Sequence, residues 1–279
     1  MSLLAAAGLG LLIGAVLGAL GGGGAILTVP ALVYLLGQTP QDATTSSLII
    51  VGLTAVVGAI GHARSGQVRW RTGTAFGVAG IAAAVAGTAA NRHVDPQVLL
   101  LGFAALMTVA AIGMLARSRH EPDHQDPPPQ PPAPAGHRGA GTAQLTRPAP
   151  APARARTMTA VKIVVAGVAV GFLTGFLGVG GGFIIVPALV LVLGLPMPIA
   201  VGTSLLIIAI NSGASLAARS GTAHFDWQII IPFTLAAMAA SLAGKKIADR
   251  LPQTVTTRAF AVLILAVAAY TAGHTLLAT

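Results

Sequence analysis

Long apolar stretches without charged residues recur along the whole chain, separated by short polar segments. The first runs from Leu3 to Leu20, and later helices are predicted over residues 43–63, 72–90, 97–116, from about 160, 198–218, 227–247 and 253–277. A helix of about 20 apolar residues crosses the roughly 30 Å hydrocarbon layer of a bilayer. The pattern therefore predicts an all-α polytopic membrane protein.

Two glycine runs interrupt this apolar pattern, and each precedes a proline. The first is Gly21–Gly24 before Pro30, and the second extends from Gly178 to Gly182 before Pro187. The apolar segment 26–37 after the first run has only 12 residues, so it is predicted to be a half-helix or a re-entrant segment. Broken backbone at membrane depth persists only where it is buried in protein or lines a wet cavity. The two interruptions therefore indicate a binding site.

The glycine runs belong to a duplicated sequence whose copies are offset by 157 positions. The offset relates Gly14 to Gly171, Gly18 to Gly175, Pro30 to Pro187, Ser47 to Ser204 and Trp70 to Trp227. Between the copies lies a segment of different composition, which holds 10 of the 18 prolines and has no apolar periodicity. We therefore predict a first transmembrane repeat over 1–116, a Pro-rich disordered cytoplasmic linker over 117–159, and a second repeat over 160–279.

Charge placement predicts how the repeats face each other. The linker end from Arg117 to Lys162 carries seven Lys or Arg residues, which places it in the cytoplasm. The arginine-rich loop 64–71 and the basic segment 245–258 are expected on the same side. This assignment gives an odd number of crossings per copy, and it therefore predicts inverted repeats with both termini outside.

Composition narrows the possible partners. Hydrophobic residues make up 54% of the chain and charged residues 8%, so the expected surroundings are the lipid bilayer of the cell membrane. The formal net charge of +9 comes from loops and the linker and does not indicate a nucleic-acid partner. The chain has no cysteine, which excludes disulfides and thiolate chemistry. We expect no cofactor and no metal, and the sequence is compatible with a homo-oligomer.

Three segments of the second copy resemble the signature of the TauE/SafE family, the sulfite exporters. They are Gly175-Phe176-Leu177-Gly178-Val179-Gly180-Gly181-Gly182 with Pro187, Ala200-Val201-Gly202-Thr203-Ser204-Leu205, and Ser220-Gly221. The first copy is similar more loosely, and the linker is not covered. The resemblance implies a membrane transporter for sulfur-containing anions such as sulfite or small organosulfonates.

The predicted site combines bare backbone donors with neutral side chains. A helix that begins inside the membrane presents free N–H groups and the positive end of its dipole, and glycines let an oxyanion approach the backbone closely. We expect one substrate site between the repeats, near their two-fold axis. Its residues are Gly22, Gly23, Gly24, Gly180, Gly181, Gly182, Ser46, Ser47, Thr203, Ser204 and Asn211.

Packing is the alternative explanation for several of these residues. Membrane glycines often let helices approach closely, a role that fits the four-residue spacing of Gly10, Gly14 and Gly18 best. Ser and Thr in membrane helices often bond a carbonyl one turn back. Asp42 is expected to cap a helix or, less favourably, to relay a proton, and His62 is expected at the membrane interface, as is His224.

The sequence thus favours a secondary transporter that moves a small anion by alternating access. An anion channel of the same architecture is the first alternative. A membrane-embedded enzyme is a second, but the chain offers no paired intramembrane carboxylates, no His-Glu-x-x-His motif and no histidine at the centre of a span.

Overall fold

The structure, a computed structural model, describes residues 3–91, 94, 96–120, 153–177, 182–219 and 225–277. All regular secondary structure within these residues is helical, which confirms the predicted fold class. In chain order the helices are α1 (Leu3–Leu20), α2 (Gly23–Pro30), the π-helical turn η1 (Ala31–Leu35), α3 (Pro40–Arg64), α4 (Trp70–Asn91), α5 (Pro96–His120), α6 (Ala153–Leu177), α7 (Gly182–Leu191), α8 (Met197–Arg219), α9 (Trp227–Ala248) and α10 (Gln253–Leu277).

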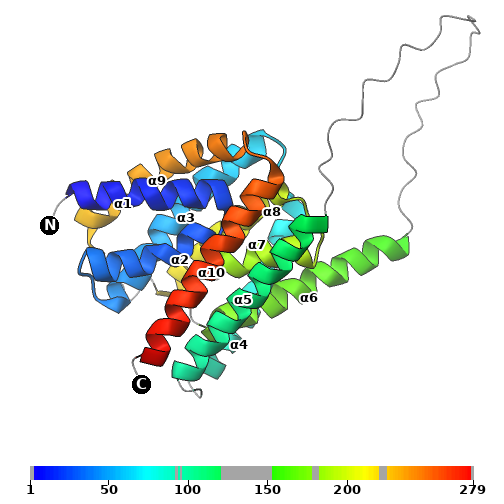
Figure 1. The fold of residues 1–279 in the computed structure, drawn as a ribbon, viewed down its shortest axis with the longest axis horizontal. Helices are drawn as coiled ribbons and strands as arrows, with labels where there is room; N and C mark the ends of the chain where they lie inside the picture. The colour runs from blue at the N-terminus through cyan, green and yellow to red at the C-terminus, as the bar shows by residue number, and fades with distance from the viewer. Residues whose placement is uncertain are drawn as a thin grey trace, which may run out of the picture.

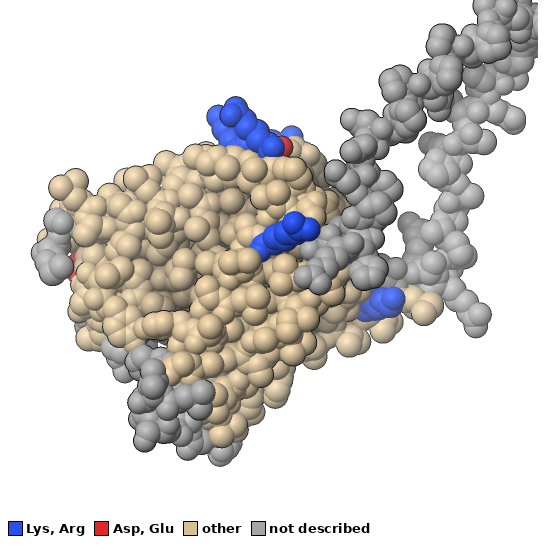
Figure 2. Space-filling model, in the orientation of Figure 1, with Lys and Arg blue, Asp and Glu red and all other residues tan. Residues whose placement is uncertain are grey.

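Five of the described helices are long and apolar enough to cross a membrane: Leu3–Leu20, Asp42–Arg64, Met197–Ala217, Trp227–Ala248 and Gln253–Gly273. Large apolar side chains such as Leu12, Val85 and Val262 lie exposed on the outside of the bundle. Figure 2 shows a broad uncharged surface, on which Lys and Arg side chains stand in a few separate places, at the top, near the centre and at the right. The chain is therefore a multi-pass protein of the cell membrane.

The first glycine run breaks the chain over fewer residues than the sequence predicts. Only Gly21 and Gly22 lie between α1 and α2, whereas Gly23 and Gly24 already belong to the first turn of α2. Gly21 has φ +74°, a left-handed conformation that favours glycine. The chain reverses there, because α2 packs back on α1 with Gly24 against Leu17. Of the second run, residues 178–181 lie outside the described residues.

Pro30 leads directly into η1. A proline cannot donate the helical N–H bond, and its ring crowds the preceding turn. The segment that follows is a π-turn, in which the Leu36 N–H donates to the Ala31 carbonyl at 3.2 Å.

Two further boundaries differ from the sequence prediction. Asp42 is not the cap of α3. The cap is Thr39, whose hydroxyl accepts from the Asp42 N–H at 3.2 Å, and the helix begins at Pro40, a residue suited to a first turn. At the predicted linker 117–159, α5 continues to His120 and α6 begins at Ala153, while residues 121–152 lie outside the described residues.

The bundle is held together by two helix pairs in which glycines bring the backbones into contact. Three glycines of α1 meet three residues of α9 in the same order: Gly10 with Phe233, Gly14 with Ala237 and Gly18 with Ser241. A Cβ atom on any of these glycines would overlap the partner backbone. The two helices therefore run parallel and side by side (Figure 1), and the predicted packing role of the glycines is confirmed.

The same contact is repeated between α6 and α4. Here Gly167 meets Phe76, Gly171 meets Gly80 and Gly175 meets Ala84, again in parallel. Each of these six residues is related to its counterpart in the α1–α9 pair by the offset of 157. The two halves therefore pack on each other reciprocally: the first helix of each half lies against the fourth helix of the other half.

Helices α3 and α8, which the offset relates to each other, pack together between these two pairs. Gly52 lies against Ser212 and Gly58 against Leu205, so the two helices run antiparallel. Between these contacts lie Thr54 and Asn211, which the offset relates to each other. Helix α7 packs on α8, and all of its residues from Gly182 to Val190 are buried. The interior of the bundle is therefore built from α3, α7 and α8.

Candidate functional site

The glycine segments of the two halves meet in the structure. A Cβ atom on Gly22 would overlap the carbonyl group of Gly182, and one on Gly182 would lie 3.2 Å from the Gly22 carbonyl oxygen. Gly22 is also the N-cap of α2, and no side chain caps that helix. The starts of two short helices, α2 and α7, therefore converge backbone to backbone in the interior of the bundle.

One face of α8 runs along this junction. A Cβ atom on Gly21 would lie 2.6 Å from the Ser204 hydroxyl oxygen and 3.3 Å from the Val201 Cα, and one on Gly182 would lie 3.1 Å from the Ile208 side chain. Ser204, Ile208 and Asn211 follow each other at helical spacing on the same face. The glycine junction thus lies beside the buried Ser204 hydroxyl, and the Asn211 amide lies on the same face of α8 about two turns further along.

The predicted hydroxyl groups differ in what they bond. Ser204 donates to the Val201 carbonyl at 2.8 Å and Ser47 to the Thr44 carbonyl at 2.7 Å, which is the one-turn-back bonding of membrane helices. The Thr203 hydroxyl accepts from the Arg69 N–H at 3.1 Å and so joins α8 to the α3–α4 loop.

Several buried oxygen atoms have no hydrogen-bond partner among the described residues. Ser46 Oγ and Asn211 Oδ1 were predicted as site atoms, and Thr54 Oγ1 was not. A buried polar atom without a partner costs about 1–3 kcal/mol, so each is retained for a reason. Thr54 was detectable in the sequence, because the offset relates it to Asn211.

The remaining predicted glycines divide into two groups. Gly24 lies against Leu17 and the Ile13 carbonyl, and Gly23 occupies the first turn of α2. Gly180 and Gly181 lie outside the described residues, as does His224. Of the eleven predicted residues, the described contacts bring together Gly22 and Gly182, with Ser204 beside the neighbouring Gly21 and Asn211 about two turns further along α8.

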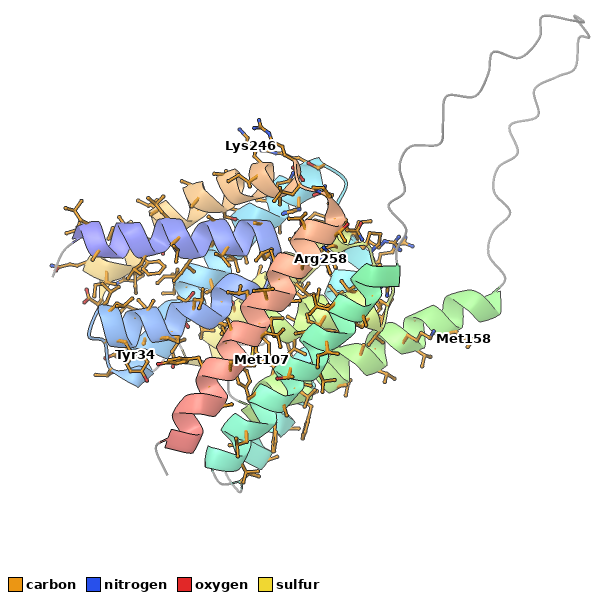
Figure 3. The ribbon with its side chains drawn as sticks, in the orientation of Figure 1. Tyr34, Met107, Met158, Lys246 and Arg258 are labelled. Carbon is orange, nitrogen blue, oxygen red and sulfur yellow. The ribbon has the colours of Figure 1, made fainter. Side chains whose placement is uncertain are left out.

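A cavity of about 110 Å³ reaches this region from the basic end of the bundle, where Figure 3 shows Lys246. Its lining includes Ala19 at the end of α1, Val201 of α8 and Thr256 of α10. Val201 also contacts Gly21, so the cavity ends beside the glycine junction.

A polar network on the wall of this cavity was missed by the sequence analysis. His62, predicted at the interface, is only 2% exposed. Its Nδ1 lies 2.7 Å from Gln67 Oε1 and its Nε2 lies 3.1 Å from the Gly18 carbonyl oxygen. The histidine is buried because α1, α3 and the α3–α4 loop close around it. The sequence placed His62 at a membrane end, and its burial within the protein was not predicted.

The network continues to the end of α9. Gln67 donates to Asp249 Oδ1 at 3.3 Å, and Lys245 pairs with Asp249 and donates to the Ser65 hydroxyl at 2.9 Å. Burial acts to raise the pKa of Asp249, but the hydrogen bonds from Lys245 and Gln67 outweigh it and lower the pKa below its ordinary value. Asp249 therefore stays a carboxylate at neutral pH.

Comparisons with known proteins agree with this architecture. The family model described as "Sulfite exporter TauE/SafE" matches residues 6–271. A probable membrane transporter protein of Xylella fastidiosa (strain 9a5c) is 32% identical over 277 residues, covering 96% of this chain and 94% of the relative. The probable membrane transporter protein YunE of Bacillus subtilis (strain 168) is 25% identical over 226 residues, covering 78% of each chain. No solved structure matches the chain significantly.

A helical membrane bundle with broken helices at its centre and relatives of this kind define a membrane transporter. The chain belongs to the TauE/SafE family.

Proposed function

We propose that this protein is a secondary transporter that moves a small anion, a sulfur oxyanion or an organosulfonate, across the cell membrane by alternating access. The convergence of Gly22 and Gly182, beside Ser204, is the observation that carries the proposal. Bare peptide groups and neutral hydroxyl groups suit a transported anion, because a fixed buried cation would hold it too tightly for release. The family name supports the choice of sulfur compounds.

The contact between Gly22 and Gly182 leaves no room for a solute between them, so the anion would bind beside the junction, along the face of α8. There the Ser204 hydroxyl lies beside Gly21 and Asn211 lies about two turns further along α8, while the unpartnered hydroxyl groups of Ser46 and Thr54 are available as donors on α3. Separation of the two short helices would then open the site to one side of the membrane at a time.

Helix directions support inverted repeats. Helix α3 runs parallel to α9, with Gly58 against Ser241 and Gly61 against Lys245, and α9 is parallel to α1. Helix α8 runs parallel to α4, which is parallel to α6. Because α3 and α8 are antiparallel, each helix of one group opposes its offset-related counterpart in the other. Such a repeat gives a carrier two related conformations, which face opposite sides.

Orientation in the membrane has a direct test. We expect reporters fused before Met1 and after Thr279 both to score as external, because the basic segments lie at the other end of the bundle. Figure 1 shows the start of α1 and the end of α10 on one side, with the end of α5 on the other. Alkaline phosphatase and green fluorescent protein fusions give complementary signals. Termini that score on opposite sides would contradict the inverted arrangement, and two cytoplasmic scores would contradict the proposed orientation.

Transport itself is tested with purified protein in liposomes. We expect labelled sulfite and sulfoacetate to enter faster than they enter protein-free liposomes, and acetate and succinate not to. Unlabelled substrate inside should accelerate uptake of label, because a carrier exchanges its solute across the membrane. Acceleration would be missing in a channel, and flux of no anion at all would rule out the proposed function.

A further inference from the structure

His62 occupies a position in which both ring nitrogens face hydrogen-bond acceptors. Nε2 faces the Gly18 carbonyl oxygen, which can only accept. Nδ1 faces Gln67 Oε1, and the orientation of that amide is fixed because its Nε2 donates to Asp249. The flipped amide would place its oxygen against the carboxylate. A neutral imidazole has one N–H and can satisfy one of the two acceptors, whereas an imidazolium satisfies both.

The surroundings of His62 contain groups that favour a positive charge on its ring and groups that disfavour it. The titratable groups that face it are Lys245 of α9 and Asp249 of the α9–α10 turn, which neutralise each other as an ion pair. From the other packed elements it meets the Gly18 carbonyl of α1, the Gln67 amide and Gly202 of α8. Removal from water disfavours the imidazolium, while the two oxygen atoms stabilise it. The two acceptors therefore offset part of the cost of removing the charged ring from water.

His62 is connected both to water and to the candidate anion site. It lines the cavity together with Ala19 and Val201, so a proton can reach it from the basic end of the bundle. A Cβ atom on Gly202, two residues before Ser204, would lie 2.9 Å from the His62 Cβ, and Gly18 is one turn before Gly21. A charge on this ring therefore lies within about one helical turn of Gly21 at the end of α1 and of Ser204 on α8.

We propose that His62 is the proton-binding residue of the carrier, which takes up one proton with each anion. The inference rests on the proposed function as an anion carrier. The proton comes from water in the cavity, forms an N–H bond on the imidazole, and returns to water on the opposite side when the carrier reorients. The added positive charge raises anion affinity, and by reciprocity a bound anion stabilises the charged ring.

The sequence of the other half does not repeat this ion pair. The offset of 157 relates Lys245 to Thr88 and Asp249 to Arg92, which cannot form a Lys–Asp pair with each other. A single proton site near one mouth is what a one-proton cycle needs.

The transport test uses labelled sulfoacetate, whose charge is constant between about pH 6 and 8, in liposomes with the membrane potential clamped by potassium and valinomycin. With the outside more acidic by about one pH unit, one proton per anion drives about tenfold accumulation inside the wild-type liposomes. The variant His62→Gln keeps an amide that can donate and accept but holds no extra proton. With this variant, the internal concentration of labelled sulfoacetate should not rise above the external one. The control variant His224→Gln should still accumulate the label about tenfold. Accumulation by His62→Gln equal to that of the wild type would overturn the proposal.

A second measurement does not depend on transport. In nanodiscs containing the full chain with ¹³C-labelled histidine, the resonance that is missing in His62→Gln identifies His62 among the seven histidines, and in the wild type it should shift with pH. A His62 resonance that does not move with pH would overturn the proton site even if anion flux is found. Absence of flux combined with a titrating His62 would contradict the proposed function instead.

Discussion

Substitution of Gly22 by alanine is expected to lower anion flux by about 100-fold or more. The added Cβ overlaps the Gly182 carbonyl, so the starts of α2 and α7 must move apart, and a displacement of about 1 Å at a binding site is enough for a loss of this size. The strain should also lower stability by about 1–3 kcal/mol. Flux is measured by sulfoacetate exchange in liposomes, after size-exclusion chromatography has established that the variant is folded.

Gly213→Ala is the matched control for this experiment. Gly213 lies on α8, two residues beyond Asn211, but a Cβ atom there meets nothing within 4 Å. The variant should transport like the wild type and be slightly more stable, because alanine favours a helix by up to about 1 kcal/mol over glycine. Normal flux through Gly22→Ala would show that the contact between the halves has no part in transport.

Substitution of Gly14 by leucine should prevent assembly of the bundle. Gly14 meets the backbone of Ala237, so a leucine forces α1 away from α9 along their whole contact. We expect a loss of about 3 kcal/mol or more, seen as a broad or void-volume peak of a fluorescent fusion in detergent.

Gly171→Leu should fail to the same extent, since Gly171 occupies the equivalent position against Gly80. Gly8→Leu tests the alternative that any leucine in α1 is harmful, because a Cβ atom on Gly8 meets nothing within 4 Å. A folded Gly14→Leu protein, or a clear difference between Gly14→Leu and Gly171→Leu, would contradict the exchanged packing of the halves.

Much of the fold was predictable because its signals are local or repeated. Apolar length gave the membrane helices, the four-residue spacing of Gly10, Gly14 and Gly18 gave a contact face, and the offset of 157 gave the two halves. The partner of that face was not predictable. A glycine stripe shows that some backbone approaches closely, but it does not say whether the other helix lies in the same half.

The local errors have simple physical causes. Asp42 and Thr39 are both good cap residues, and the structure prefers Thr39 because Pro40 then occupies the first turn without losing a helical hydrogen bond. The glycine run appeared to be one interruption, but only Gly21 needs a left-handed backbone, and Gly23 is compatible with a helix once α2 is packed against α1.

The network around His62 could not be found by the same reasoning. Gln67 and Asp249 are far apart in the sequence, and the second copy has no equivalent pair to draw attention to them. A histidine close to the end of an apolar helix is ordinarily interfacial. Here the end of α9 covers the α3–α4 loop. Lys245 at that end forms an ion pair with Asp249, so neither charge is buried without a partner.

The network around Asp249 also has a thermodynamic consequence for the proposed alternating-access cycle. Exact two-fold symmetry would make the inward-facing and outward-facing arrangements equal in free energy, with half of the molecules in each. Bonds from Gln67 to Asp249 and from Lys245 to Ser65 tie the α3–α4 loop to the end of α9. We expect the resting population to be weighted toward the arrangement that keeps those bonds, so that the solute must supply differential binding energy to redistribute it.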